Sequence, residues 1–168
     1  MAKFQSDDLT ELPFGLPGRI FRSPMPFGAF DPKEWVLSHA LQAGVSVVVD
    51  LVPDDEALAK TGKELRSMYL QQGLEVIHMP VADFEAPPDG ELDSALHAAL
   101  TKARLGKHIL VHCNAGYGRT GIFMACLARL LFGLDGPEAV SWVRQYIPPA
   151  LENEQQLDFV YRYNTGTP

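Results

Sequence analysis

A nucleophile and an anion-binding side chain lie close together in the stretch HCNAGYGRTG, residues 112–121. Five residues separate Cys113 from Arg119, and Thr120 follows the arginine. A cysteine thiolate is a strong nucleophile, and the planar guanidinium of arginine can bind two oxygens of one phosphate. These residue types at this spacing predict covalent phosphoryl transfer, in which the sulfur attacks phosphorus while Arg119 neutralises charge on the phosphate oxygens.

The same stretch also contains the glycine pattern GxGxxG, as Gly116, Gly118 and Gly121. In a dinucleotide-binding domain an acidic residue follows about 20 residues later, at the tip of the next strand. Residues 138–146 have a helical pattern instead, and no strand is predicted after Gly121. The Walker A pattern fails as well, because Ile122 stands where that pattern has lysine. Nucleotide binding is therefore disfavoured.

The elements on either side of this stretch explain how it would bind an anion. Residues 108–113 are predicted to form a strand, and residues 120–133 an apolar helix with Arg129 as its one charge. A loop between a strand and a helix directs backbone N–H groups and the helix N-terminus toward one point. Such surroundings lower the pKa of a cysteine from about 8.5 into the range ~3.5–7.5, so we expect Cys113 to be a thiolate at neutral pH.

The expected site is a phosphate cradle with the thiolate at its base. Thr120 is expected to donate its hydroxyl to the sulfur, and His112 to orient the loop through a ring hydrogen bond. The residues expected to bind the phosphate are Asn114, Ala115, Gly116, Tyr117, Gly118 and Arg119.

Predicted strands and helices alternate along the chain. The apolar runs VSVVVDL (45–51) and LEVIHMP (74–80) are typical of buried strands. One helix is predicted from Asp31 as N-cap, with Pro32 and Glu34 in its first turn, to Gly44. Further helices are predicted within 90–106, 137–147 and 153–163, the last with Asn153 as N-cap. This order indicates an α/β fold with a mainly parallel central sheet flanked by helices. We expect one domain over residues 1–168, with 1–17 as a loosely ordered N-terminal segment.

The composition limits the possible partners. Fourteen Lys and Arg against 21 Asp and Glu give a net charge of −7, which disfavours binding of nucleic acid or anionic membranes through overall charge. The two cysteines, Cys113 and Cys126, do not form a zinc or disulfide pattern, and the histidines lack metal-binding spacing. Cys126 is expected to pack in the core, with a redox partnership with Cys113 as the alternative. We expect a cytoplasmic monomer with no metal or cofactor.

The stretch HCNAGYGRT resembles the signature His-Cys-x5-Arg-Ser/Thr of the cysteine-based protein tyrosine phosphatase superfamily. The chain is most similar to its compact dual-specificity and small prokaryotic-type members. A looser likeness runs through VVVDLVPDDE, VIHMPVADFEAPP and the final helix. The resemblance implies a phosphatase fold and hydrolysis through a phosphocysteine. The implied substrates are phosphotyrosine proteins, with phosphoserine and phosphothreonine as further candidates.

The resemblance also implies a general acid upstream of the signature. Asp83 is the candidate, because it follows a predicted strand end in a loop that contains prolines, and Asp89 is the nearest rival. Gln156 resembles the glutamine that positions water for hydrolysis of the phosphoenzyme, although Gln155 is adjacent and a helix-surface amide is the alternative. Glu56 is either a salt-bridge partner of Arg119 or a solvated carboxylate.

Three alternatives to a protein phosphatase stay open. The first is a phosphatase of non-protein substrates such as phosphoinositides. The second is a rhodanese-type sulfurtransferase, which Asp83 and the full Cys-x5-Arg-Thr spacing disfavour. The third is a phosphate-binding module without turnover, which the presence of Cys113, Arg119 and Asp83 disfavours.

Overall fold

The computed structural model describes residues 8–88 and 90–166, and within them one five-stranded sheet forms the centre of the molecule. Its spatial order is β1-β2-β5-β3-β4. Strand β1 is antiparallel to β2, and the other neighbouring pairs are parallel, as predicted for a mainly parallel sheet. The strands span Thr10–Leu12 (β1), Ile20–Ser23 (β2), Val45–Asp50 (β3), Glu75–His78 (β4) and His108–His112 (β5).

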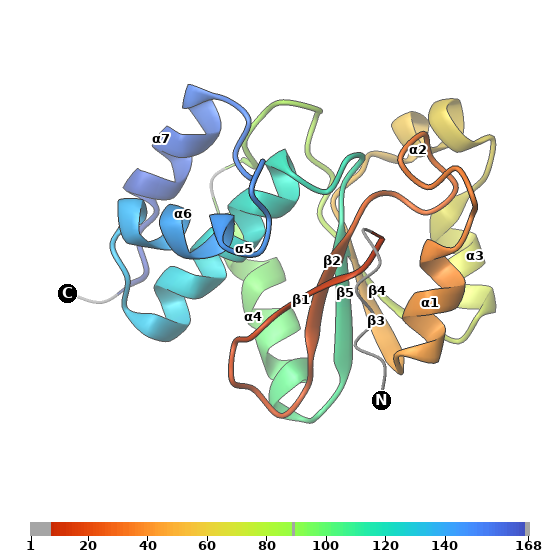
Figure 1. Ribbon diagram of the computed structural model, residues 1–168, viewed down its shortest axis with the longest axis horizontal. Coiled ribbons are helices and arrows are strands. Elements are labelled where there is room, and N and C mark those ends of the chain that lie inside the picture. The colour runs from red at the N-terminus through yellow and green to blue at the C-terminus, as the bar shows by residue number, and fades with distance from the viewer. Residues whose placement is uncertain (1–7, 89, 167–168) are drawn as a thin grey trace.

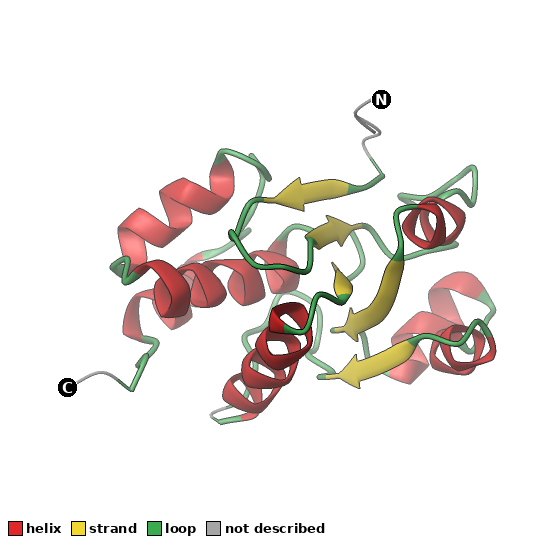
Figure 2. Ribbon diagram, turned by 90° about the horizontal axis from the view of Figure 1, so that it is seen from below, coloured by secondary structure: helices red, strands yellow, loops and turns green. Residues whose placement is uncertain are grey.

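Helices cover both faces of this sheet (Figure 2). Helices α1 to α3 lie on one side, and α4 to α7 lie on the other (Figure 1). The helices span Val36–Gln42 (α1), Asp54–Thr61 (α2), Leu65–Gln71 (α3), Glu91–Arg104 (α4), Gly118–Phe132 (α5), Gly136–Arg144 (α6) and Glu154–Arg162 (α7). The expected α/β architecture is therefore confirmed.

The most deeply buried elements are the ones that the sequence predicts to be apolar throughout. Val47, Val48 and Val49 of β3 are fully buried, as a central parallel strand with helices on both faces requires. In α5 every residue from Gly118 to Ala128 is buried. This helix therefore holds the end of the Cys113 stretch rigidly against the core.

The four parallel strands end level with one another. Ser23 and Asp50 both lie beside His112, and His78 lies beside Asp50. Because side chains that follow the carboxyl ends of parallel strands meet at one edge of a sheet, the segments after β2, β3, β4 and β5 converge there. This edge positions the site.

We expected a loosely ordered N-terminal segment over residues 1–17. This expectation is wrong for residues 8–17, the part of the segment that the structure describes. Strand β1 pairs with β2, and Leu9, Leu12 and Phe14 are buried in the core. The ring of Phe14 packs against Trp142, with 5.0 Å between ring centres. The apolar side chains anchor this segment despite its proline and glycine content.

The first helix begins later than predicted. Helix α1 starts at Val36, and Glu34 lies before it with φ = +55°. Asp31 does act as a cap, because its carboxylate accepts hydrogen bonds from the backbone N–H groups of Trp35 and Phe27, both at 2.9 Å. It caps a turn of residues 31–35 that precedes the helix, so Glu34 does not form the predicted capping box.

Within the described ranges, no single helix has the length and apolar character needed to cross a membrane. Helices α5 and α6 together have the length and apolar composition of a membrane span, but the chain bends by 118° between them.

Candidate active site

The Cys113 loop, residues 113–117, connects the end of β5 to the start of α5 at the edge where the parallel strands end (Figure 1). Gly116 has φ = +84°, a conformation that glycine adopts without strain. A Cβ atom there would lie 2.4 Å from Nη2 of Arg22 and 2.5 Å from the carbonyl oxygen of Ser23. The tight curl of the loop therefore requires glycine at position 116.

Arg22, on β2, orients the peptides of this loop. Its side chain is 5% exposed, and it donates to the carbonyl oxygens of Ala115 at 2.9 Å and Gly116 at 3.2 Å. In a planar trans peptide the N–H points opposite to the C=O. The N–H groups of Gly116 and Tyr117 therefore point away from Arg22, as an anion-binding nest needs.

The sequence analysis missed Arg22. An arginine inside the apolar strand sequence IFRS was the available signal, since a charged side chain there must find buried partners. Its guanidinium also lies 5.2 Å from the ring centre of Tyr117, so Tyr117 packs against Arg22.

His112 ties the loop to the core through a buried polar cluster. Its Nδ1 lies 3.0 Å from the carbonyl oxygen of Cys113, so Nδ1 carries the hydrogen that makes this bond. On the other side of the ring, Nε2 lies 2.8 Å from the hydroxyl of Tyr69 and 3.7 Å from Oδ1 of Asp50. All these side chains are at most 1% exposed. The expected ring hydrogen bond of His112 to the loop is present.

Tyr69 keeps its proton in this cluster. Burial raises the pKa of its phenol well above the ordinary value, and the negative charge of Asp50 adds to the effect. The hydroxyl therefore stays available to donate to His112.

Arg119 is held by two carboxylates and one carbonyl. It is 2% exposed, and it donates from Nη1 and Nη2 to the two carboxylate oxygens of Glu56 at 3.0 and 2.9 Å. Nη1 also donates to the carbonyl oxygen of Val81 at 2.8 Å, and Nη2 lies 3.1 Å from Oδ1 of Asp83. Glu56 is therefore a salt-bridge partner of Arg119 and not a solvated carboxylate.

Two buried polar atoms beside the Cys113 loop make no hydrogen bond to any described residue. They are Nε of Arg119 and Oγ1 of Thr120. The expected bond from Thr120 to Cys113 is thus not formed in this structure. A buried donor without a partner is costly, and a phosphate oxygen would satisfy Nε of Arg119.

The neighbours of Arg119 keep its guanidinium group protonated. Burial alone would lower the pKa of the guanidinium. The hydrogen bonds to Glu56 and the negative charges of Glu56 and Asp83 help to outweigh burial, so the pKa lies above its usual range. Arg119 is therefore a permanent cation next to Cys113.

Asp83 lies beside Arg119, in the loop that follows β4. Its side chain is 32% exposed, and its Oδ2 lies 3.4 Å from Nζ of Lys60. The rival acid, Asp89, lies outside the described residues. Glu152 is a further carboxyl that the sequence analysis missed, and burial and the charge of Asp83 raise its pKa.

Gln156 is not a helix-surface amide. Its side chain is fully buried, and its Oε1 accepts a hydrogen bond from the N–H of Glu152 at 2.8 Å. Its Nε2 donates to the carbonyl oxygen of Glu85 at 3.4 Å and would lie 2.7 Å from a Cβ atom at Gly118. Gln156 therefore lies between the Asp83 loop and the start of α5.

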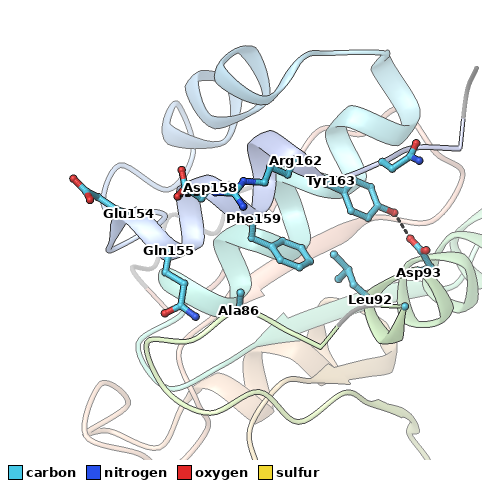
Figure 3. A pocket seen from close by; sticks show the side chains of 11 residues that line it. Ala86, Leu92, Asp93, Glu154, Gln155, Asp158, Phe159, Arg162 and Tyr163 are labelled. Atoms are coloured by element: carbon cyan, nitrogen blue, oxygen red, sulfur yellow. Dashed lines mark hydrogen bonds and ion pairs between the residues drawn. The ribbon is translucent and has the colours of Figure 1, made fainter.

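The neighbouring Gln155 faces a different space. It lines a pocket of about 730 Å³ between α7 and the segment that leads into α4, with Phe159 at its centre (Figure 3). Tyr163 donates a hydrogen bond to Asp93 at the far end of this pocket. The structure thus separates the two glutamines that the sequence left as alternatives.

Both cysteines are free, and Cys126 is completely buried in α5. Burial raises the pKa of the Cys126 thiol far above its ordinary value, which makes it inert. Among the described residues, no cluster of three or more His, Cys, Asp or Glu side chains could hold a metal ion.

Solved structures with this architecture define the class of protein as a cysteine-based phosphatase. The structure of Tk-PTP in its active form is 32% identical, with a TM-score of 0.70 over 84% of this chain and 88% of that one. The kinase associated phosphatase with its catalytic cysteine replaced by serine shares the fold, with a TM-score of 0.83 at 16% identity over 95% of this chain and 94% of that one.

Residues 34–165 match the family model described as PTP-SAK, Swiss Army Knife protein, DSP-PTPase phosphatase domain. The chain belongs to this family, which confirms the resemblance based on HCNAGYGRT. Mouse protein tyrosine phosphatase type IVA 2 is 34% identical over 95 residues, 55% of this chain and 56% of that protein. The match spans somewhat over half the length of this protein and of a protein from Methanocaldococcus jannaschii that is 32% identical.

Proposed function

We propose that this protein is a phosphatase that hydrolyses phosphotyrosine in proteins through a phosphocysteine intermediate, with phosphoserine and phosphothreonine as further substrates. The observation that carries the proposal is the arrangement of Arg119 beside the Cys113 loop. Nε of Arg119 is a buried donor without a partner. Nη2 lies on the same edge of the guanidinium group as Nε. That edge matches two oxygens of a phosphoryl group.

In the first step the Cys113 sulfur attacks phosphorus. The N–H groups of the loop and Arg119 stabilise the negative charge on the non-bridging oxygens. The bond from phosphorus to the leaving oxygen breaks, and Asp83 gives its proton to that oxygen, because an alkoxide is a poor leaving group. The products of this step are the dephosphorylated substrate and phosphocysteine.

In the second step a water molecule attacks phosphorus, and the Asp83 carboxylate takes its proton. The phosphorus–sulfur bond breaks and releases inorganic phosphate and the Cys113 thiolate. We assign the orientation of this water to Gln156, whose Oε1 accepts a hydrogen bond from the N–H of Glu152 and has a second lone pair. The side chains of this chain thus account for every bond and proton of the cycle without a metal or cofactor.

Charge favours a protein substrate over a polyanionic one. The chain has a net charge of −7, and Glu56, Asp83 and Glu152 surround Arg119. Additional phosphates on a phosphoinositide would meet these carboxylates. A turnover panel of phosphotyrosine, phosphoserine and phosphothreonine peptides beside phosphoinositides tests this preference.

The covalent mechanism is tested with Cys113→Ser. This variant should lose turnover of an aryl phosphate while it still binds phosphate esters, because a hydroxyl is not ionised near neutral pH. Rapid quenching of the wild type should trap a phosphorylated cysteine. Appreciable turnover by the serine variant excludes the mechanism, and no turnover by the wild type on any ester excludes the proposed activity.

Asp83→Asn tests the general acid. Loss of a positioned proton donor should lower kcat by ~10²–10⁴ for phosphopeptides and much less for esters with acidic leaving groups. An equal loss with every leaving group points to another acid, with Glu152 and Asp89 the next carboxyls to replace.

A further inference from the structure

We propose that Asn153 is a positioning residue for the general acid: its side-chain amide anchors the loop that carries Asp83, residues 79–88, to the N-terminus of α7. The inference rests on the proposed function, because it takes Asp83 as the group that protonates the leaving oxygen. The sequence predicted Asn153 only as the N-cap of the last helix. In the structure the same amide also contacts the Asp83 loop.

Both ends of the Asn153 amide are used. Oδ1 accepts a hydrogen bond from the backbone N–H of Gln156 at 2.9 Å, which caps α7. Nδ2 donates to the carbonyl oxygen of Phe84 at 2.8 Å. A backbone N–H can only donate and a carbonyl can only accept, so these partners fix which end of the amide is oxygen and which is nitrogen. Asn153 therefore joins the start of α7 to the residue that follows Asp83.

The backbone at Phe84 needs such an anchor. The N–H of Glu85 donates to the carbonyl oxygen of Ala82 at 3.0 Å, which closes a turn. Asp83 and Phe84 are the central residues of this turn, and Phe84 has φ = +64°, which a bulky residue rarely adopts. Phe84 is 59% exposed, so packing of its ring does little to hold this conformation. Strained backbone persists only where surrounding contacts maintain it, and the bond from Asn153 is such a contact from outside the loop.

The segment that carries Asn153 is itself tied to the Cys113 loop. The N–H of Leu151 donates to the carbonyl oxygen of Tyr117, the last residue of that loop, at 3.2 Å. Gln156, which is fully buried, donates from Nε2 to the carbonyl oxygen of Glu85 at 3.4 Å. Asn153 lies between Leu151 and Gln156 in the chain. It therefore connects the turn at Asp83 to a segment whose position is set by the Cys113 loop.

The anchor does not depend on the contacts of the Asp83 carboxylate. Nη2 of Arg119 lies 3.1 Å from Oδ1 of Asp83, and a bound phosphoryl group would engage the same nitrogen. Lys60, 3.4 Å from Oδ2, is 37% exposed, and such an ion pair contributes little. The bond from Asn153 acts on the backbone of the turn instead. It therefore holds the turn whether or not a phosphate has taken Nη2 of Arg119.

Two substitutions remove the anchor and keep the helix cap. Asn153→Asp has the same shape and still offers an oxygen to the N–H of Gln156, but it has no donor for the Phe84 carbonyl. Asn153→Ser is also a good N-cap, carries no charge and is too short to reach Phe84. The matched control is Asp135→Ser, because Asp135 caps α6 in the same way, through the N–H of Glu138 at 2.8 Å. Thermal unfolding of each variant checks the fold.

Amide hydrogen exchange tests the anchor independently of activity. Peptides that cover residues 79–88 should exchange about fivefold faster in both Asn153 variants, because loss of one hydrogen bond lets the turn open more often. Peptides from α7 should exchange at the wild-type rate, and so should the Asp83 loop in Asp135→Ser. Unchanged exchange over 79–88 overturns the anchor. Equal acceleration in the loop and in α7 also overturns it, because the helix end and not the bond to Phe84 would then hold the loop.

Steady-state kinetics test the effect on chemistry. In both Asn153 variants we expect kcat on a phosphotyrosine peptide to fall about tenfold, since a misplaced catalytic group costs up to ~10². The loss should shrink for esters with acidic leaving groups. KM should change less than about twofold, because Arg119 and the Cys113 loop still bind the phosphate. Asp135→Ser should behave as wild type.

A double variant separates the possible outcomes. In an Asp83→Asn background, Asn153→Ser should cause no further loss of kcat on the peptide, because both changes act through the same group. A wild type without activity on any ester overturns the proposed function, and a normal Asp83→Asn variant overturns the acid. If both hold and the Asn153 variants keep full kcat, or lose it equally with every leaving group, the Asn153 inference alone is wrong.

Discussion

Nη2 of Arg22 lies 2.4 Å from the point that a Cβ atom on Gly116 would occupy. The arginine and the glycine are thus fitted to each other, and the loop can curl around the phosphate site only while both are present. The fit sets the direction of the loop carbonyls and so the direction of the N–H groups on the opposite side of the same peptides.

Gly116→Ala should therefore damage both the loop and the stability. We expect a loss of roughly 1–3 kcal/mol in the free energy of unfolding from the strained backbone, and more from the contact with Arg22 and Ser23. Phosphate release and chemical denaturation measure the two effects. Gly106→Ala is a matched control, since Gly106 has φ = +88° but nothing within 4 Å of its Cβ position. Equal behaviour of the two variants contradicts the fit.

Arg119→Lys should impair both binding and turnover. An ammonium group can bind one phosphate oxygen but cannot hold two in a plane, and it cannot keep the two-pronged bond to Glu56. We expect a rise in KM and a fall in kcat, each measured by steady-state hydrolysis of an aryl phosphate. Near-normal values of both would mean that Arg119 does not bind the phosphoryl group.

Tyr69→Phe should destabilise the protein and weaken the hold of His112 on the loop. The change removes the hydroxyl that lies 2.8 Å from Nε2 of His112 and leaves a buried nitrogen without this partner. The expected cost is about 1–3 kcal/mol in the free energy of unfolding. Urea denaturation measures it, and Tyr161→Phe, on an exposed tyrosine of α7, serves as the control.

Glu75 should make the stability depend on pH in the acidic range. Hydrogen bonds from Lys102 and Lys107 lower the pKa of this carboxyl from 4.5 to about 2. Because the folded-state pKa is the lower one, the contribution is complete above the unfolded pKa and is lost as the pH falls toward 2. The side chain is 41% exposed, so solvent limits the contribution to about 1 kcal/mol or less.

The corresponding measurement is urea unfolding of wild type and Glu75→Gln between pH 7 and pH 2. The variant should be slightly less stable at pH 7, and the two curves should converge at the acidic end. A stability gap that stays constant over this range would show that the ion pairs do not cause it.

The sequence predicted the central elements because their patterns are strong. The β-branched run of β3 and the apolar stretch of α5 each leave one interpretation, and both elements form as expected. Strand β2 was missed, because its four residues lie in a segment whose prolines and glycines indicate loop. Helices α2 and α3 were missed because they are short and mostly polar outside a few buried positions.

The candidate site also contains some residues that the sequence indicated and others that it did not. Cys113, Arg119 and Asp83 could be located because their spacing or their place after a strand is visible in the chain. The partners of Arg22 and Tyr69 could not be predicted, because each acts through a residue that is distant in sequence. A local pattern contains no information about which β-strand will lie next to the Cys113 loop.

This distance in sequence also concerns how the protein folds. Arg22 and Gly116 are 94 positions apart in the sequence, and Glu56 and Arg119 are 63 positions apart. Closing such long loops has an entropic cost that must be met before the contacts can form, so distant pairings tend to form late. A chain that has regained its helices but not the pairing of β2 with β5 would have the cysteine without an ordered cradle. Recovery of catalytic activity during refolding should therefore report the arrival of the native topology rather than the return of secondary structure.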